Sequence, residues 1–512
     1  GRPGPSTPND FSAYCWSGRP MYDLVVLGGG PGGLNVASAA ARVGARVALV
    51  EKSHLGGECT HTACVPSKAL IQAARVVHQV RAAGEYGVRT PAPEVDFAAV
   101  MARVRRVVAD FAGSDSGDSL RARGIEVFRG SPAFEAYDTV VVDGQEHLVS
   151  QRFVIATGSR PAVPNVPGLA GAGYLDNRTV WDLDELPLAL IILGAGPTGM
   201  EFAQAFARLG SDVTVLADSE QVLPREDVEI SERVRAALAA EGITIRTGVE
   251  VTRVARRDGQ TACSYRRTST GETGEVAGTH LIVATGRRPN IEGLNLDAAG
   301  IHADPVHGIE VDEYLQTRST RTYAIGDVLQ DHQFTHAAER EAAVAFQNAV
   351  LRLPKKIDYS ALPWAVFVDP EVATVGLSES AARARRPEVR AFRAEFADLD
   401  RARIDGRTQG FAKVVVLPSG KILGATILGE QAALILQEFV LAMENGLALQ
   451  DIAATTHTYP TYAGLARKLA NEFLATRHEG GLVQTAIRWF YGYRPKVADG
   501  GATEPEIHAE AH

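Results

Sequence analysis

Residues 22–33 read YDLVVLGGGPGG, and this stretch decides the fold of the N-terminal part of the chain. The apolar, β-branched run 22–27 is typical of a buried parallel strand. Glycines follow it in the spacing GxGxxG, at Gly28, Gly30 and Gly33. In that spacing the early glycines allow a tight turn that approaches a pyrophosphate, and the last one lets a helix pack closely on the strand.

A helix and a second strand complete this unit. Residues 34–44 have a helix-like pattern, and the apolar run 45–50 leads into Glu51. A carboxylate at the end of the second strand can accept hydrogen bonds from a ribose diol. The sequence therefore predicts a βαβ dinucleotide-binding unit.

The same pattern returns later in the chain. The apolar run 189–193 leads into a second glycine loop with Gly194, Gly196 and Gly199, and a helix and a strand follow at 200–216. One chain is thus predicted to hold two dinucleotides. After the second unit, strands near 281–284 and 323–325 are expected to return to the first domain.

Two charged residues follow the second unit and bear on which nicotinamide it binds. Asp218 comes just after the strand, where a carboxylate favours NADH because it binds the ribose 2′-hydroxyl and repels a 2′-phosphate. Arg225, on a nearby turn, would favour NADPH instead. We expect NADH or NADPH, with the carboxylate tipping the balance towards NADH.

Composition narrows the class of protein. The 512 residues carry a formal net charge of −9, which argues against nucleic acid or an anionic membrane as the main partner. No apolar run reaches the roughly 18–20 residues of a membrane span. The four cysteines are too few for a secreted disulfide framework, so we expect a cytoplasmic protein. Cys263 is expected in a polar surface strand, without a role.

A cysteine pair is the chemical centre of the sequence. Residues 56–68 read GGECTHTACVPSK, with Cys59 and Cys64 just before a predicted helix. The helix dipole and Lys68 should lower the pKa of a nearby thiol, and a dithiol held this way can act as a two-electron switch. The alternatives are a structural disulfide, which is rare in the cytosol, and a metal site, for which only His61 is near in sequence.

This cysteine motif, following a βαβ unit, resembles the class I pyridine nucleotide-disulfide oxidoreductases, which include dihydrolipoyl dehydrogenase, glutathione reductase and mercuric reductase. The resemblance runs from Met21 to about residue 485. Further matching points are Ala156-Thr157-Gly158, Ala284-Thr285-Gly286, residues 323–327, Thr335-His336-Ala337 and residues 370–377.

The resemblance implies an α/β fold with two Rossmann-like domains, for FAD and for NAD(P), and a C-terminal α+β dimerisation domain. The expected limits are a disordered leader at 1–20, an FAD-binding domain at 21–164 with a return segment at 283–354, an NAD(P)-binding domain at 165–282, a dimerisation domain at 355–485 and a tail at 486–512. A homodimer is implied because each site in the family needs the partner's C-terminal domain.

The resemblance also implies roles for individual residues. Cys59 would be the interchange thiol that meets the substrate and Cys64 the thiol against the flavin, while Lys68 would pair with Glu201 near the flavin. The expected cofactor contacts, from motifs and resemblance together, are Gly28, Gly30, Gly33, Glu51, Lys68, Thr157, Gly158, Gly194, Gly196, Gly199, Asp218, Gly286, Gly326, Asp327, Thr335, His336 and Ala337. No resident metal is expected.

The sequence departs from the family at the catalytic base. Disulfide reductases carry His-Pro-Thr near the C-terminus with a glutamate after it, whereas Tyr459 and Gly464 occupy those two places here. A free tyrosine has a pKa of about 10 and is a poor base at neutral pH. His457 and His61 are the alternative bases.

We therefore expect an FAD-dependent NAD(P)H oxidoreductase that exchanges electrons between Cys59–Cys64 and a small disulfide or dithiol. The alternative is a flavin reductase that acts on a quinone, a metal ion or another acceptor without the usual His–Glu dyad. Efficient mercuric reduction is not expected, because the sequence has no further cysteine after Cys263 to form a C-terminal pair.

Overall fold

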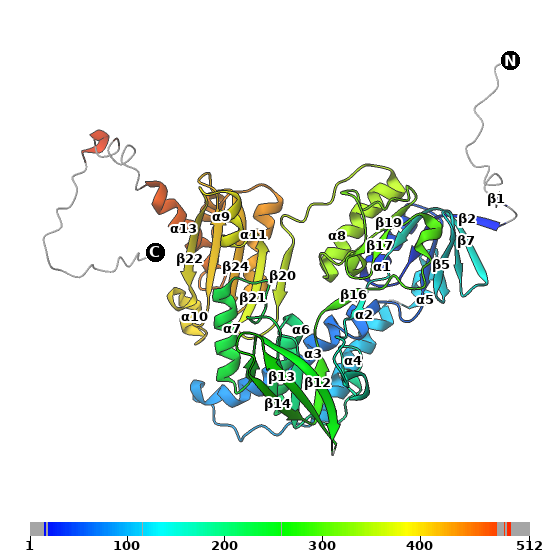
Figure 1. Ribbon diagram of the computed structural model, residues 1–512. Helices are drawn as coiled ribbons and strands as arrows, with labels where there is room; N and C mark the ends of the chain where they lie inside the picture. The colour runs from blue at the N-terminus through cyan, green and yellow to red at the C-terminus, as the bar shows by residue number, and fades with distance from the viewer. Residues whose placement is uncertain are drawn as a thin grey trace.

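The computed structural model describes residues 15–16, 19–114, 116–257, 259–478, 486 and 489–492. Figure 1 shows two α/β bodies and a third, sheet-and-helix body at the C-terminal end, with α3 (Cys64–Ala82) and α6 (Pro197–Leu209) between them. The architecture is the α/β fold with two nucleotide-binding domains and a C-terminal dimerisation domain that the sequence predicts. The residue limits of these domains remain a prediction.

The first sheet has the strand order β4-β3-β2-β7-β6-β5, and β19 pairs with β7. Its central strands are parallel, and Leu24 to Leu27 of β2 are fully buried, which explains the continuous apolar run at the start of the chain. Helices α1 (Pro31–Arg42) and α8 (Thr335–Phe346) pack against each other beside it. The strands are β2 (Arg19–Leu27), β3 (Val47–Glu51), β4 (Ile125–Arg129), β5 (Pro132–Ala136), β6 (Thr139–Val142), β7 (Glu146–Ile155) and β19 (Thr322–Ala324).

The second sheet is parallel, in the order β11-β10-β9-β15. The antiparallel strands β12, β13 and β14 form a separate sheet nearby, visible at the bottom of Figure 1. The elements of this part are β9 (Ala189–Leu193), α6 (Pro197–Leu209), β10 (Asp212–Leu216), α7 (Val228–Ala240), β11 (Thr244–Arg246), β12 (Val249–Arg257), β13 (Gln260–Arg267), β14 (Thr273–Gly278) and β15 (His280–Val283).

Two expectations for this region are wrong. Strands near 281–284 and 323–325 were expected to return to the first domain, but the former, as β15, pairs with β9 of the second sheet, and β19 is the strand that returns. Cys263 was expected at the surface, but its side chain is fully buried in β13, against an apolar cluster that includes Leu169 and Val249. Ser264 and Arg266 take the alternate, more exposed positions of the strand, while Thr261 shares the buried face with Cys263.

Helices and a short ribbon connect the two nucleotide-binding parts. The cysteine segment forms α2 (Gly57–His61) and α3 (Cys64–Ala82), and α3 packs against α6 and against α4 (Phe97–Ser114). The chain crosses between the two parts at β8 (Ser159–Pro161) and β16 (Arg287–Pro289), which pair antiparallel. This ribbon fixes the two crossing segments side by side.

The C-terminal part is an antiparallel sheet in the order β20-β21-β24-β23-β22, covered by helices. Phe396, Phe439 and Phe473 are fully buried in its core. Its elements are β20 (Pro363–Val366), β21 (Glu371–Gly376), α9 (Glu379–Arg385), β22 (Arg390–Glu395), α10 (Asp400–Ile404), β23 (Phe411–Val416), β24 (Ile422–Gly429), α11 (Ala432–Glu444), α12 (Leu449–Ala454) and α13 (Gly464–His478).

Helix α6 ties the second nucleotide-binding part to the turn between β20 and β21. Arg208, whose side chain is only 4% exposed, donates to Glu241 at 2.7 Å and to Asp369 at 2.8 Å. Gln204, one turn earlier, both donates to the backbone carbonyl of Asp369 and accepts from its N–H, each at 2.7 Å. These bonds anchor the turn that follows Phe367.

The ends of the chain lie largely outside the described residues, and so do most of the predicted leader and tail. Inside the predicted leader, the described residues of β1 (Cys15–Trp16) pair antiparallel with Arg19 and Pro20 and extend the first sheet. Among the described helices, none combines the length and the apolar character that crossing a membrane requires.

Candidate active site

A cavity of about 1830 Å³ runs past both glycine loops and the cysteine pair. It exceeds the roughly 300–1,000 Å³ of a single small-molecule pocket. Most of the predicted site residues line it: Gly28, Gly30, Glu51, Cys59, His61, Cys64, Lys68, Thr157, Gly158, Gly194, Gly196, Glu201, Asp218, Arg225, Gly286, Gly326, Asp327, Thr335 and His336. Gly33, Gly199 and Ala337 are not among the lining residues, and Ala337 is fully buried.

The first loop requires glycine at Gly28 and at Gly33. Gly28 has φ +110°, and a Cβ there would lie 2.3 Å from the carbonyl oxygen of Ala156. A Cβ on Gly33 would lie 2.0 Å from the carbonyl oxygen of Gly28, so the helix can approach the strand only without one. A Cβ on Gly30 would meet nothing nearer than 4.0 Å, which leaves open space for a pyrophosphate at the N-terminus of α1. The loop fits the pyrophosphate of FAD.

Glu51 shapes this loop as well as lining the cavity. Its carboxylate accepts hydrogen bonds from the backbone N–H of Gly29 at 2.6 Å and of Ser53 at 2.7 Å. A carboxylate has about four acceptor positions, so both contacts leave capacity for a ribose hydroxyl.

The second loop repeats the construction of the first. Gly194 has φ +106°, and a Cβ there would lie 2.4 Å from the carbonyl oxygen of Ala284. A Cβ on Gly199 would lie 2.0 Å from the carbonyl oxygen of Gly194, whereas one on Gly196 would point into open space. This loop therefore fits a second dinucleotide at the N-terminus of α6.

The two cysteines sit where the cysteine segment meets the first loop. Gly57 adopts φ +61°, and a Cβ there would lie 2.8 Å from the Cα of Gly30, so glycine is needed for this close approach. The short helix α2 that begins there carries Cys59, and Cys64 is the first residue of α3. Both thiols are partly exposed and both line the cavity.

One hydroxyl contacts both sulfurs. Thr335 Oγ1 donates to Cys59 Sγ at 3.0 Å and lies 3.5 Å from Cys64 Sγ. The hydrogen bond from the Cys59 thiol, a hydrogen bond that Thr335 can donate when it is not donating to Cys59, and the Lys68 ammonium hold the pKa of Cys64 well below its ordinary value. The hydrogen bond to Cys64, burial and the repulsion of the two sulfurs hold the pKa of Cys59 well above its ordinary value. In the reduced pair the thiolate is therefore favoured on Cys64.

Lys68 is held by an ion pair across the two nucleotide-binding parts. Its Nζ lies 2.8 Å from Glu201 Oε2, and the other carboxylate oxygen accepts from the backbone N–H of Phe367 at 2.9 Å. The ammonium also lies 4.7 Å from the centre of the Phe367 ring. These contacts keep a positive charge next to Cys64.

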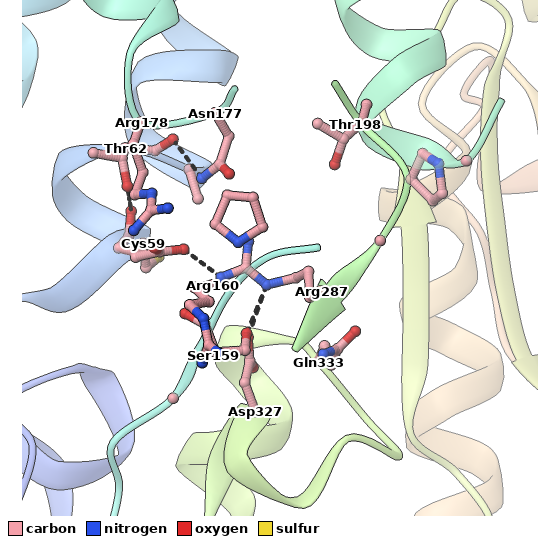
Figure 2. A pocket seen from close by; sticks show the side chains of 18 of the residues that line it. Cys59, Thr62, Ser159, Arg160, Asn177, Arg178, Thr198, Arg287, Asp327 and Gln333 are labelled. Carbon is pink, nitrogen blue, oxygen red and sulfur yellow. Dashed lines mark hydrogen bonds and ion pairs between the residues drawn. The ribbon is translucent and has the colours of Figure 1, made fainter. Parts of the chain in front are cut away.

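An arginine that the sequence reading passed over crosses the cavity between the cysteine segment and Asp327. Arg287 forms an ion pair with Glu58, the residue before Cys59, and its Nε lies 3.4 Å from Asp327 Oδ2 (Figure 2). Ser159 donates to the same oxygen of Asp327 at 2.6 Å. The sequence offered one signal, Glu58 inside the cysteine motif, because a carboxylate there needs a basic partner.

Behind Asp327 lies a buried carboxyl that sequence reasoning also missed. Glu341 accepts from the backbone N–H of Gly326 and from the hydroxyl of Tyr359, the latter at 2.8 Å. Burial raises the pKa of Glu341 to about 7. Near the start of α8, the helix that also carries Glu341, His336 Nε2 lies 2.6 Å from the carbonyl oxygen of Pro363.

The predicted base candidates of the C-terminal part do not line the cavity of their own chain. Tyr459 is 77% exposed and donates to Asp400 at 3.1 Å, and this bond raises the pKa of the phenol. His457 is paired instead with Glu438, at 2.9 Å, and with the backbone carbonyl of Thr455. Whether either residue acts in a partner's site stays a prediction. His61, by contrast, lines the cavity with its ring against His54.

The comparisons with known proteins agree with this geometry. The family model for pyridine nucleotide-disulphide oxidoreductases matches residues 22–342, and the model for the dimerisation domain of the same family matches residues 362–470. The chain belongs to the pyridine nucleotide-disulphide oxidoreductase family. The family is FAD-dependent and uses NAD(P)H, and its dimerisation domain supports a homodimer.

Named relatives of this oxidoreductase span several activities. A mercuric reductase of Lysinibacillus sphaericus is 34% identical over 86% of the chain and 81% of its own length. A dihydrolipoyl dehydrogenase of Geobacillus stearothermophilus is also 34% identical, over 89% of the chain and 96% of its own length. A solved Cu(II) complex of the HOCl-induced flavoprotein disulfide reductase RclA of Escherichia coli has a TM-score of 0.78 and 27% identity, covering 88% of this chain and 99% of that one.

Proposed function

We propose that this oxidoreductase passes electrons from NAD(P)H to the Cys59–Cys64 pair, and from there to a small disulfide. A nicotinamide delivers a hydride, that is two electrons and a proton, which together convert a disulfide into one thiol and one thiolate. Bound FAD supplies the two-electron link between the nicotinamide and the sulfurs. In the reverse direction the same pair would oxidise a dithiol.

The observation that carries this proposal is the contact of both sulfurs with the Thr335 hydroxyl. This contact lies at the wall of a cavity that both glycine loops also line. A structural disulfide would gain nothing from a neighbouring ammonium. A thiolate does gain from Lys68, because the positive charge stabilises it.

The test is anaerobic reduction of the purified holoenzyme by NADH and by NADPH. A long-wavelength charge-transfer band between the Cys64 thiolate and the flavin should appear in the wild type and be absent in Cys64→Ser. Cys59→Ser should show the band before reduction, because its Cys64 is then a thiolate beside oxidised flavin. NADH should bleach it, since without a disulfide the two electrons stay on the flavin, and disulfide turnover should be lost. If wild type and Cys64→Ser give the same spectra, the proposal fails.

A second candidate is reduction of a metal ion, and one observation favours it. Tyr459 stands where disulfide reductases of the family carry a histidine, and its raised pKa keeps the phenol protonated at neutral pH. A thiophilic metal ion needs two sulfur ligands but no proton acceptor. Mercuric reductases and a Cu(II) complex are among the relatives.

Steady-state turnover separates the two candidates. Lipoamide, glutathione disulfide, mercuric ion, cupric ion and a quinone are each tested with both nicotinamides. Turnover of a disulfide that needs Cys59 supports the first proposal, and turnover of a metal ion alone that needs Cys59 supports the second. Quinone turnover that survives Cys59→Ser would mean that electrons leave from the flavin instead.

A further inference from the structure

Thr335 lies at the first position of α8, where a side-chain hydroxyl usually hydrogen-bonds to the backbone of its own helix. The residue before it, Phe334, is the N-cap and has no side chain that can accept a hydrogen bond from the helix. The Thr335 hydroxyl contacts two sulfurs from a segment 276 and 271 residues earlier. Its position is therefore a feature of the reactive pair rather than of the helix.

A hydroxyl between two sulfurs can serve only one of them as donor. It carries one proton to give and lone pairs with which to accept. When Thr335 donates to Cys59, at 3.0 Å, the contact with Cys64 must have the Cys64 thiol as its donor. The reverse arrangement has the Cys59 thiol donating to Thr335 and Thr335 donating to the Cys64 thiolate.

These two arrangements differ in which sulfur is the thiolate. After two-electron reduction the pair holds one proton, since a hydride brings one proton with its electron pair. The favoured state has the thiolate on Cys64, but attack on a substrate disulfide needs the thiolate on Cys59. The proton must therefore move from Cys59 to Cys64 before each attack, and Thr335, which contacts both sulfurs, offers a path beside the direct hydrogen bond between them.

We propose that Thr335 is a catalytic residue that performs this transfer, taking the proton of the Cys59 thiol while giving its own to the Cys64 thiolate. The products are a Cys59 thiolate, which the Thr335 hydroxyl still stabilises as donor, and a Cys64 thiol. No external base is consumed. The transfer would stand in for the histidine that this chain lacks at Tyr459, and it rests on the proposed role of the cysteine pair.

The test is alkylation of the two thiols in holoenzyme reduced with dithiothreitol, with the label on each cysteine counted separately by peptide mass spectrometry. Thr335→Val removes the hydroxyl at nearly constant volume, and Thr335→Ser restores it. Loss of a hydrogen bond to a thiolate should slow alkylation of Cys59 by iodoacetamide at neutral pH by roughly tenfold. Thr335→Ser should keep the rate within about twofold of wild type.

Matched controls make the outcome decisive. Thr139→Val makes the same substitution in β6, where the hydroxyl bonds Asp138 and does not line the cavity, and should leave the alkylation rate unchanged. A wild-type rate for Cys59 in Thr335→Val overturns the inference, because the proton would then pass directly between the sulfurs. Equal slowing in Thr335→Ser and Thr335→Val also overturns it, since the methyl group would be responsible.

The readout separates this inference from the proposed function. Dithiothreitol reduces the pair without a nicotinamide, so the alkylation rates do not depend on which acceptor or nicotinamide the enzyme uses. A wild type that NADH and NADPH fail to reduce contradicts the proposed function. A wild type that they do reduce, with a fast-alkylating Thr335→Val variant, contradicts only the role of Thr335.

Discussion

Glu201 on α6 lies 2.8 Å from the ammonium of Lys68 on α3, so a helix of the second nucleotide-binding part holds the charge beside Cys64. The side chain of Glu201 is 8% exposed and that of Lys68 is 39% exposed. The carboxylate is thus the better shielded partner, and it fixes the position of the lysine. Because the same carboxylate accepts from Phe367, the turn before β21 is tied to the same point.

Removing this charge should shift the titration of the cysteine pair. The Lys68 ammonium helps to lower the pKa of Cys64 to about 6, so Lys68→Met should raise it by about one unit. In NADH-reduced enzyme the pH at which half of the charge-transfer band appears should rise accordingly. Lys356→Met, at an exposed ion pair with Glu313, is the control. An unchanged midpoint in Lys68→Met would show that the ammonium does not act on the thiolate.

Two neighbouring glycines of the second loop should respond differently to alanine. Gly199→Ala places a Cβ 2.0 Å from the carbonyl oxygen of Gly194 and should disrupt the packing of α6, with loss of thermal stability. Gly196→Ala meets no protein atom within 4 Å and should keep the melting temperature, yet it fills the space of the pyrophosphate. We expect Gly196→Ala to retain bound FAD while its Kd for the nicotinamide rises at least about tenfold, measured by flavin-fluorescence titration. Normal nicotinamide affinity in this variant would place the dinucleotide elsewhere.

The buried arginine of α6 should be important for stability. Arg208→Met leaves Glu241 and Asp369 without their shared partner, and breaking such a pair costs about 3–5 kcal/mol. Arg266→Met removes an exposed pair with Glu250, which is worth at most about 1 kcal/mol. Denaturant unfolding of both variants measures the difference. Similar small losses would mean that α6 and the β20–β21 turn are held chiefly by apolar packing.

Glu341 should give the protein a pH-dependent stability near neutrality. Burial raises its pKa to about 7, so between the ordinary carboxyl pKa and 7 the folded chain binds a proton that the unfolded chain has released. This contribution to stability is fully present below the ordinary carboxyl pKa and is lost as the pH rises through about 7. Glu341→Gln removes the titrating group and should flatten this part of the stability profile.

The comparison uses unfolding free energies of wild type and Glu341→Gln from pH 5 to pH 8, together with flavin retention. Glu371 also has a pKa raised by burial to about 7, and it contributes equally to both proteins, so the difference between them isolates Glu341. Parallel profiles would contradict the assignment. Because ionised Glu341 repels the nearby Asp327 carboxylate, we expect wild type to lose FAD more readily at high pH than Glu341→Gln does.

The sequence by itself determined the parts of this protein that depend on local sterics. The two glycine loops could be recognised because a tight turn, a close helix and a pyrophosphate impose glycine at fixed spacing, and a Cβ at Gly33 or Gly199 would indeed lie 2.0 Å from a carbonyl oxygen. The cysteine motif could be recognised from the sequence in the same way, because the thiols and the following helix lie within one short segment. Family membership followed from these motifs.

The tertiary structure alone decided which distant groups meet at the site. Thr335 reaches the sulfurs, Arg287 reaches Glu58, and Glu438 reaches His457. No periodicity encodes such contacts, because each depends on how separately formed elements pack. For the same reason the strand at 280–283 joined the second sheet, and Cys263 turned out to be buried. A β-strand pattern specifies alternate faces but neither the neighbouring strand nor the layer that covers each face.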